Sequence, residues 1–556
     1  MKHTVLKSIA AAIIALGMTG CSDELNLHSI DPQSSPSADE MSVLAKCYAT
    51  LGLTGQKGAG GDGDLSDDEG ESGFYRTTFN CQELSTDECL WAWQADGGIP
   101  EFTNMSWNSS TTRVQWVYTR LTYDITLFNS YLQNTADDAD HKAYRAEVRF
   151  LRALHYWYML DLFGKTPFKT EFNISVLPTE KAGKELYEWI DQELTEIESI
   201  LPSVGTYNTA DNFGRADQGA AYMLHARLAL NSSVYTDGAV TDYQKAKDYC
   251  DKLINSGKYS LSSTAKNGYS GYAQVFMADN DENTNAMHEI ILPIRQDGQK
   301  TRCYSGAMYL VNSIRKAGMP DMGTTNGWSC NFARAALIKK FFPTLSDCPL
   351  STEEAPNGAT EAEIKALDEQ DGSSTKQIIA AAGDDRALFY AGRGGGVRKR
   401  QTDIISSFND GISIVKWDNH RSDKQATHDN TEYPDVDIPL LRYAEAYLTR
   451  AEAEWRLGQS TAALADVNVL RTRANAKPLT TLTDMTLLDE WCREFYMEGR
   501  RRSDLVRFGC YTTSKYLWDW KGGAANGTTV DSKYNVYPIP ADDIVNNPNM
   551  TQNSGY

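Results

Sequence analysis

The stretch AEVRFLRALHYWYMLDLFGKTPF, residues 146–168, says more about the fold than any other part of this sequence. Apolar side chains recur in it at the three- and four-residue spacing of a helix with one buried face. These are Val148, Leu151, Leu154, Tyr158 and Leu162. Gly164 is expected to end the helix, and Pro167 prevents it from restarting. Small residues beside large aromatic ones suit close packing on other helices, so we predict a buried helix in a helical array.

Helical patterns of this kind recur in pairs along the chain. We predict helices at 113–134 and 143–163, at 185–200 and 215–235, at 243–256, at 440–457 and 462–474, and at 490–507. Their spacing and alanine content resemble tetratricopeptide repeats, in which stacked helix pairs bury a continuous core. Residues 261–433 lack this period and are rich in Gly, Asn, Asp and Thr. The predicted fold is therefore mainly α, with a large loop-rich, mixed α/β excursion mounted on the helical scaffold.

Four of these blocks and the C-terminal tail resemble the SusD/RagB family of outer-membrane nutrient-binding lipoproteins. The blocks are residues 146–168, 208–231, 437–458 and 489–509, and the tail is residues 537–556. The resemblance implies a SusD-like fold, which we expect as one domain over residues 43–556. Its scaffold would lie at about 113–260 and 437–508, and its ligand-binding excursion at about 261–433.

The amino terminus has the pattern of an export signal. A short apolar run at residues 9–18 follows a basic start and is too short to span a bilayer, so residues 1–20 are expected to be cleaved. The sequence Met-Thr-Gly-Cys resembles a bacterial lipobox, with Cys21 acylated. Residues 21–42 would then form a lipidated tether. Residues 22–24 resemble the acidic tag that sends Bacteroidetes lipoproteins to the cell surface, although an ordinary signal peptide with an incidental cysteine stays open.

Composition narrows the classes of partner and chemistry. The formal net charge of -20 disfavours nucleic acid and favours a neutral ligand if the ligand is a glycan. The remaining cysteines lack zinc-site spacing and are expected to be buried and free, although a Cys81–Cys89 disulfide stays open. No metalloprotease or serine-hydrolase motif is present. A glycosidase needs only two carboxylates, so the sequence alone leaves one open. The family is non-catalytic, so we expect no enzyme and no required cofactor.

Two tryptophans, Trp91 and Trp93, stand in the polar segment CQELSTDECLWAWQADGGIP, residues 81–100. In an extended segment, residues two apart project to the same side, so both indoles could face one ligand. Indole faces suit the apolar C–H faces of sugar rings. Two core tryptophans are the alternative, against which the polar surroundings argue.

Three stretches are similar to those of the starch-binding founder of the family: residues 74–94, 300–306 and 322–330. That resemblance implies an aromatic arc of Trp91, Trp93 and Tyr304, extended by Trp328. Arg76 would donate hydrogen bonds to sugar hydroxyls. The Gly- and Asp-rich loop around residues 62–70 would close over the glucan. Its contributing residues are Asp67, Glu69 and Gly70.

One position departs from the founder's pattern. Asp96 stands where the founder has an asparagine as a polar clamp on the sugar. An amide both donates and accepts hydrogen bonds, whereas an ionised carboxylate only accepts. The exchange is expected to weaken or redirect binding.

The family resemblance also suggests a structural calcium ion. Its ligands would be Asp281, from a run of alternating oxygen-bearing residues, with Asp435 and Asp437. Plain solvated carboxylates are the alternative.

The resemblance thus implies a starch-binding protein at the exterior of the outer membrane, which passes α-1,4-glucan to a SusC-like TonB-dependent transporter. The alternative is a docking or lid subunit of such a transporter for a different glycan.

Overall fold

The structure, a computed structural model, describes residues 40–55, 63–65, 70–210, 212–315, 319–325, 327–393, 398–408, 410–427 and 432–556. The chain divides into two compact units, Met1–Lys46 and Cys47–Tyr556. Of the first unit, the structure describes the start of helix α2 (Glu40–Ala49). The predicted signal peptide, Cys21 and residues 21–39 of the predicted tether lie outside the described residues. All other described elements belong to the second unit.

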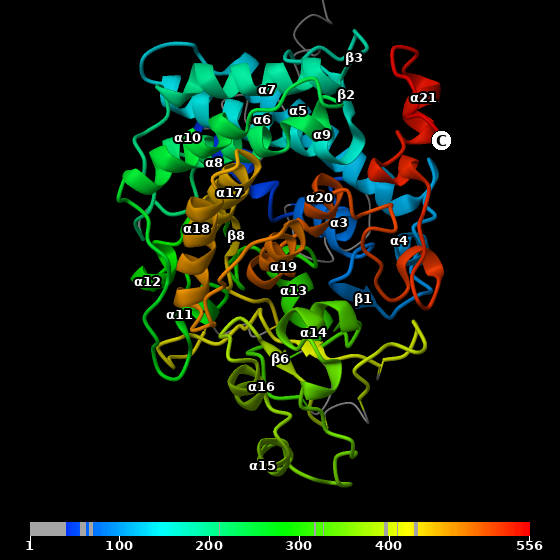
Figure 1. Ribbon diagram of the computed structural model, residues 1–556. Helices are drawn as coiled ribbons and strands as arrows, with labels where there is room; N and C mark the ends of the chain where they lie inside the picture. Colours follow the sequence, from blue (N-terminus) through cyan, green and yellow to red (C-terminus); the bar gives the residue numbers. More distant parts are fainter. Residues whose placement is uncertain are drawn as a thin grey trace, which may run out of the picture. The chain divides into compact units, whose positions relative to one another are not determined.

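The second unit is mainly helical, as the sequence predicts. Three predicted helices differ in detail, because residues 215–235 and 490–507 are each divided between two helices and residues 440–442 belong to a strand. Its scaffold helices are α5 (Thr112–Asn134), α6 (Lys142–Phe163), α7 (Gly183–Glu198), α8 (Gln218–Leu230), α10 (Tyr243–Asn255), α17 (Tyr443–Arg456), α18 (Ser460–Arg473), α19 (Asp484–Phe495) and α20 (Arg501–Arg507). Helix α5 packs on α6, α6 on α7, α8 on α10, and α17 on α18. The two halves of the scaffold, which are far apart in sequence, meet where α17 packs on α8 and α10 (Figure 1).

Helix α6 is the helix predicted from residues 146–168, and its predicted core positions are all buried. Val148, Leu151, Leu154, Tyr158 and Leu162 lie within it against the neighbouring helices. The helix ends at Phe163, where Gly164 takes a left-handed φ of 68° and its N–H donates to the carbonyl oxygen of Leu160 at 2.9 Å. Glycine adopts this conformation without the steric cost of a side chain, which explains the stop.

The described residues between 261 and 433 form loops, short strands and short helices, as expected. The helices are α11 (Gly271–Gln274), α12 (Thr284–Met287), α13 (Gly306–Ile314), α14 (Ala335–Phe341), α15 (Glu361–Asp371) and α16 (Thr375–Ala382); the strands are β4 (Ile290–Ile294), β5 (Asn331–Ala333), β6 (Phe389–Tyr390) and β7 (Ser413–Ile414). Helices α14, α15 and α16 gather at the lower end of the view in Figure 1. Strand β4 ties this segment to the scaffold, because it pairs antiparallel with β8 (Ile438–Arg442), directly before α17.

A small ribbon of strands joins the first part of the chain to this excursion. Strand β1 (Cys89–Trp91), which follows helix α3 (Phe74–Glu83), pairs antiparallel with β5. Ala333 of β5 also pairs with Ile412, directly before β7, and β7 pairs with β6. The remaining short elements of the described residues are α4 (Ile99–Asn104), α9 (Ser232–Tyr235), α21 (Ala541–Asn546), β2 (Lys165–Phe168), β3 (Thr179–Ala182) and the 3-10 helices η1 (Leu345–Asp347), η2 (Lys521–Gly523) and η3 (Ser532–Asn535).

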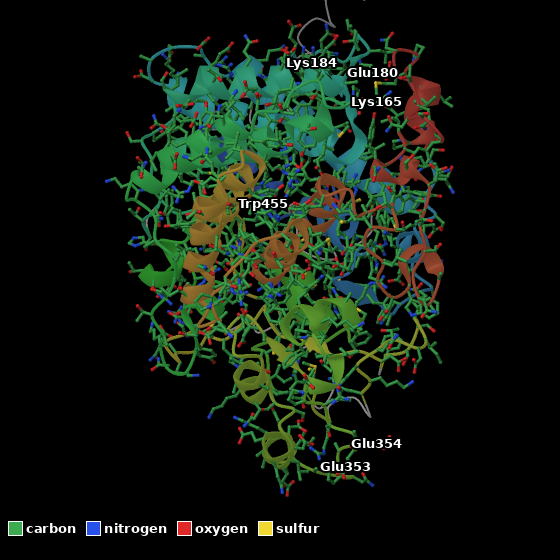
Figure 2. All side chains as sticks on the ribbon, in the orientation of Figure 1. Lys165, Glu180, Lys184, Glu353, Glu354 and Trp455 are labelled. Atoms are coloured by element: carbon green, nitrogen blue, oxygen red, sulfur yellow. The ribbon has the colours of Figure 1, made fainter. Side chains whose placement is uncertain are left out.

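The C-terminal tail packs on the β2–β3 pair. Lys165 of β2 donates to the hydroxyl of Thr551 at 2.7 Å, and Glu180 of β3 accepts from the backbone N–H of Thr551 at 2.8 Å. Figure 2 shows Lys165 and Glu180 next to each other on these strands.

Two further predictions concern cysteines and membrane spans. The nine cysteines from Cys47 to Cys510 are buried and free, Cys81 and Cys89 included, so the prediction of small buried side chains is confirmed. Within the described ranges, no helix is long and apolar enough to cross a membrane.

Candidate functional site

The two tryptophans of the predicted arc differ in burial. Trp91 ends strand β1 and is 4% exposed, whereas Trp93, in the loop after the strand, is 44% exposed. The Trp91 ring stacks on Tyr309 of α13, with centroids 5.2 Å apart and planes at 20°. Its Nε1 donates to Oδ2 of Asp96 at 3.2 Å. Trp93 therefore exposes an indole face to a ligand, whereas the ring of Trp91 is held in place by its stacking and its hydrogen bond.

The guanidinium group of Arg76, on helix α3, makes most of its contacts with other protein groups. Its Nη1 donates to the carbonyl oxygen of Tyr304 at 3.1 Å and its Nη2 to Glu71 at 2.8 Å. The guanidinium also lies 4.7 Å from the centroid of the Tyr309 ring. Burial lowers the pKa of Arg76, and the Glu71 carboxylate opposes that shift. Among the described residues, Nε of Arg76 has no hydrogen-bond partner, and it is buried.

Tyr304 and Trp328 form the other side of the arc. Their ring centroids lie 6.3 Å apart with planes at 56°, so the two faces are set at an angle. Gly70 passes directly beside this corner with a φ of 97°, and a Cβ there would come within 2.8 Å of the backbone N of Ser305. No other residue type fits that approach without displacing the backbone. Asp67 and Glu69, predicted in the same loop, lie outside the described residues.

These side chains meet in one cleft of about 380 Å³. It is lined by Glu71, Arg76, Trp91, Trp93, Asp96, Tyr304, Met308, Trp328, Cys330 and Glu432. The structure thus brings together six residues that the family resemblance singled out, from α3, from β1 and the loop after it, and from the loops before α13 and β5. Sequence reasoning missed the other four. Glu71 could have been noticed beside Gly70, but no local signal marks Met308, Cys330 or Glu432.

Opposite charges lie close together at the cleft. Oε1 of Glu71 accepts from Arg76 and, at 3.2 Å, from Nη2 of Arg113. Arg113 is buried, donates to the carbonyl oxygen of Gly97 at 2.8 Å, and lies 4.0 Å from Asp96. Two arginines thus lie against two of the three carboxylates that line the cleft, and hydrogen-bonding groups border its aromatic faces. Such a surface suits a neutral, polyhydroxylated ligand.

Comparison with known proteins identifies the family of the chain. The chain is 56% identical, over the full length of both proteins, to the starch-binding protein SusD of Bacteroides thetaiotaomicron. Residues 288–556 match the model of the SusD family.

The chain belongs to the SusD family.

Solved structures of the SusD family share its fold. A SusD-like protein from Bacteroides fragilis matches with a TM-score of 0.65 at 18% identity, covering 93% of this chain and 96% of that one. Surface glycan-binding protein A from Bacteroides thetaiotaomicron, solved in complex with laminarihexaose, matches with a TM-score of 0.63 at 17% identity, covering 92% of this chain and 98% of that one. At these identities the likeness establishes the fold alone.

Two of the three residues of the predicted calcium site, Asp281 and Asp437, lie against an arginine in this SusD-family structure. Arg295 donates from Nη2 to Asp281 at 2.9 Å, and its Nε lies 3.2 Å from Oδ2 of Asp437. Asp435 accepts from the backbone N–H of Gly298 at 2.8 Å. Among the residues that the structure describes, no three His, Cys, Asp or Glu side chains are grouped to hold a metal ion. An ion bound there would have to displace the Arg295 guanidinium.

Calcium therefore stays a prediction, and melting temperatures test it. A melting temperature that calcium raises over EDTA, in the wild type but not in Asp437→Asn, would support the site. Equal melting temperatures with and without calcium would contradict it.

Proposed function

We propose that this protein captures starch, as α-1,4-glucan or maltooligosaccharide chains, and hands it to a SusC-like TonB-dependent transporter without cleaving it. The observation that carries the proposal is the cleft in which Trp91, Trp93, Tyr304 and Trp328 border Arg76 and Asp96. The name of the full-length relative, a starch-binding protein, supports the choice of glycan.

The cleft would recognise the shape of a glucan chain. Sugar rings expose apolar C–H faces that pack on indole and phenol rings, and burial of both surfaces drives the contact. The planes of Tyr304 and Trp328 meet at 56°, which suits a curved α-1,4-linked chain better than a flat one. Glu71, Asp96 and Glu432 supply acceptors for sugar hydroxyls at the border of the cleft.

We expect the affinity of one cleft to be modest. A dissociation constant of roughly millimolar to tens of micromolar corresponds to about -4 to -6 kcal/mol. A starch polymer that meets many copies of the protein would be held more tightly, because each further contact is intramolecular. Acylation of Cys21 would hold those copies on the outer membrane, facing the cell exterior.

The contacts of two of the three carboxylates that line the cleft support binding without catalysis. A glycosidase needs one carboxyl group as acid and a second as base or nucleophile on either side of the scissile bond. Here Glu71 accepts from two arginines, and Asp96 accepts from the indole of Trp91. Incubation of the purified protein with starch is therefore expected to release no reducing sugar.

Affinity gel electrophoresis tests the choice of glycan. The protein is expected to be retarded in gels that contain amylopectin and to run freely in gels with dextran, inulin or xylan. Retardation in another polysaccharide would favour the alternative, a lid subunit for a different glycan. The absence of retardation in every gel would remove the starch proposal.

Replacement of Asp96 tests whether this residue acts by positioning Trp91. Asp96→Ala removes the acceptor of the Trp91 indole N–H, and we expect maltoheptaose binding to weaken about two- to ten-fold. Asp96→Asn keeps an acceptor oxygen and adds a donor, so it is expected to bind at least as well as the wild type. Isothermal titration calorimetry of the two variants measures the difference. Equal losses in both would show that the negative charge of Asp96, and not its acceptor, matters.

A further inference from the structure

A second pair of exposed aromatic rings adjoins the cleft on the outer side of Trp93. Phe408 is 42% exposed and its ring centroid lies 6.3 Å from that of Trp93, with the planes at 62°. Trp93 lines the cleft, whereas Phe408 is not among its lining residues. The two rings therefore continue the aromatic surface of the cleft beyond its border.

The segment that carries Phe408 is tied down by its own hydrogen bonds. Oδ2 of Asp410 accepts from the backbone N–H groups of Asp403 at 2.9 Å and Ile404 at 3.2 Å. Trp520 donates from Nε1 to the carbonyl oxygen of Thr402 at 2.9 Å. Several of the backbone groups before Phe408 are thus paired, which favours one position of the ring.

The same strand ribbon places both rings. Ala333 of β5 donates its backbone N–H to the carbonyl oxygen of Ile412 at 2.9 Å, and on its other side it pairs with Cys89 of β1. Trp93 follows β1 by two residues, and Phe408 precedes Ile412 by four. The rings therefore extend from the two segments that flank β5, and their centroids lie 6.3 Å apart.

We propose that Trp93 and Phe408 form an outer sugar subsite, which holds a glucose unit of the same α-glucan chain after it leaves the cleft. Both rings are large, apolar and nearly half exposed. Packing against the face of a sugar ring would therefore remove apolar surface of both rings from water. Their continuity with the cleft identifies the occupant as the next part of the bound chain. This inference rests on the proposed starch-binding function.

The subsite makes affinity depend on chain length. A short chain such as maltotriose fills the cleft alone, whereas maltoheptaose is long enough to reach Phe408 as well. In Phe408→Ala we therefore expect maltoheptaose to bind about three- to ten-fold more weakly and maltotriose to bind as in the wild type. Isothermal titration calorimetry with both sugars measures the two constants.

Two further variants isolate the aromatic face. Ile404→Ala truncates a side chain of the same segment that is 60% exposed and carries no ring, and it is expected to leave both constants unchanged. Phe408→Leu keeps apolar bulk without a flat face, and it is expected to lose most of the maltoheptaose preference. Melting temperatures equal to that of the wild type would show that all three variants are folded.

The outcomes separate this inference from the function on which it rests. If the wild type binds both sugars and Phe408→Ala binds maltoheptaose unchanged, or loses maltotriose to the same extent, the outer subsite is wrong and the starch proposal stands. If the wild type binds neither sugar, both are overturned.

Discussion

Trp93→Ala is expected to weaken binding of maltoheptaose about ten- to hundred-fold while leaving the melting temperature unchanged. Trp93 is 44% exposed, so its ring contributes little to the core and most of its open face is available to a ligand. Loss of the apolar contact between an indole and a sugar ring costs about 1.5–3 kcal/mol, which gives this change in the dissociation constant. Isothermal titration calorimetry and retardation in amylopectin gels measure the effect.

Trp455→Ala is the matched control for that experiment. Trp455, at the end of α17, is also partly exposed and donates from Nε1 to Asp484 at 2.8 Å (Figure 2). It does not line the cleft, and its removal is expected to leave glucan binding unchanged. Wild-type affinity in Trp93→Ala, or an equal loss in Trp455→Ala, would contradict the placement of the binding surface.

Trp91 is the poorer choice for this test, although the sequence places it beside Trp93. It is 4% exposed and stacks on Tyr309. Alanine in its place would leave a cavity and would also remove a ring that lines the cleft. A loss of binding in Trp91→Ala would therefore combine a packing defect with a lost contact.

Arg442→Met is expected to lower the free energy of unfolding by about 3–5 kcal/mol, because it removes a cation that pairs with several buried carboxylates. Arg442 is 1% exposed and donates to Glu289 at 3.0 Å, to Glu494 at 2.7 Å and to Glu498 at 2.7 Å. Burial opposes ionisation of Glu494, but the guanidinium groups of Arg473 and Arg442 outweigh it and hold its pKa below the ordinary value. For a unit of this size, the loss corresponds to a melting temperature lower by about 3–5 °C.

Lys184→Met is the control, because it removes a cation from an exposed ion pair. Lys184 lies 3.5 Å from Glu188 with its side chain 54% exposed, and it stands at the surface near β3 in Figure 2. Exposed pairs contribute about 0–1 kcal/mol, so its melting temperature is expected to stay within about 1 °C of the wild type. Equal shifts in the two variants by thermal denaturation would contradict a stabilising role of the buried network.

The helical scaffold could be predicted from the sequence because its signal is local. The apolar spacing in α6 and the stop at Gly164 depend on residues within one or two turns of each other, and both are found in the structure. The loop-rich excursion could be predicted for the same reason, since the helical period stops at its borders. The pairing of β1 with β5 could not, because three-residue strands over 200 residues apart carry no periodic pattern.

The prediction of the candidate site depends on the family resemblance more than on any local sequence pattern. Arg76, Trp93 and Tyr304 are far apart in sequence, and nothing in their local spacing brings them to one cleft. The burial of Trp91 depends on its contact with Tyr309, a long-range neighbour. The role of Glu71 likewise depends on Arg113, which only the packing of α5 places beside it.

Determination of a crystal structure of the protein grown with maltoheptaose tests the central proposal most directly. We expect glucose rings in the cleft, with one ring face against Trp93 and others against the corner formed by Tyr304 and Trp328. Maltoheptaose bound elsewhere on the protein, or a cleft without sugar at saturating concentration, would contradict the assignment of this cleft to starch.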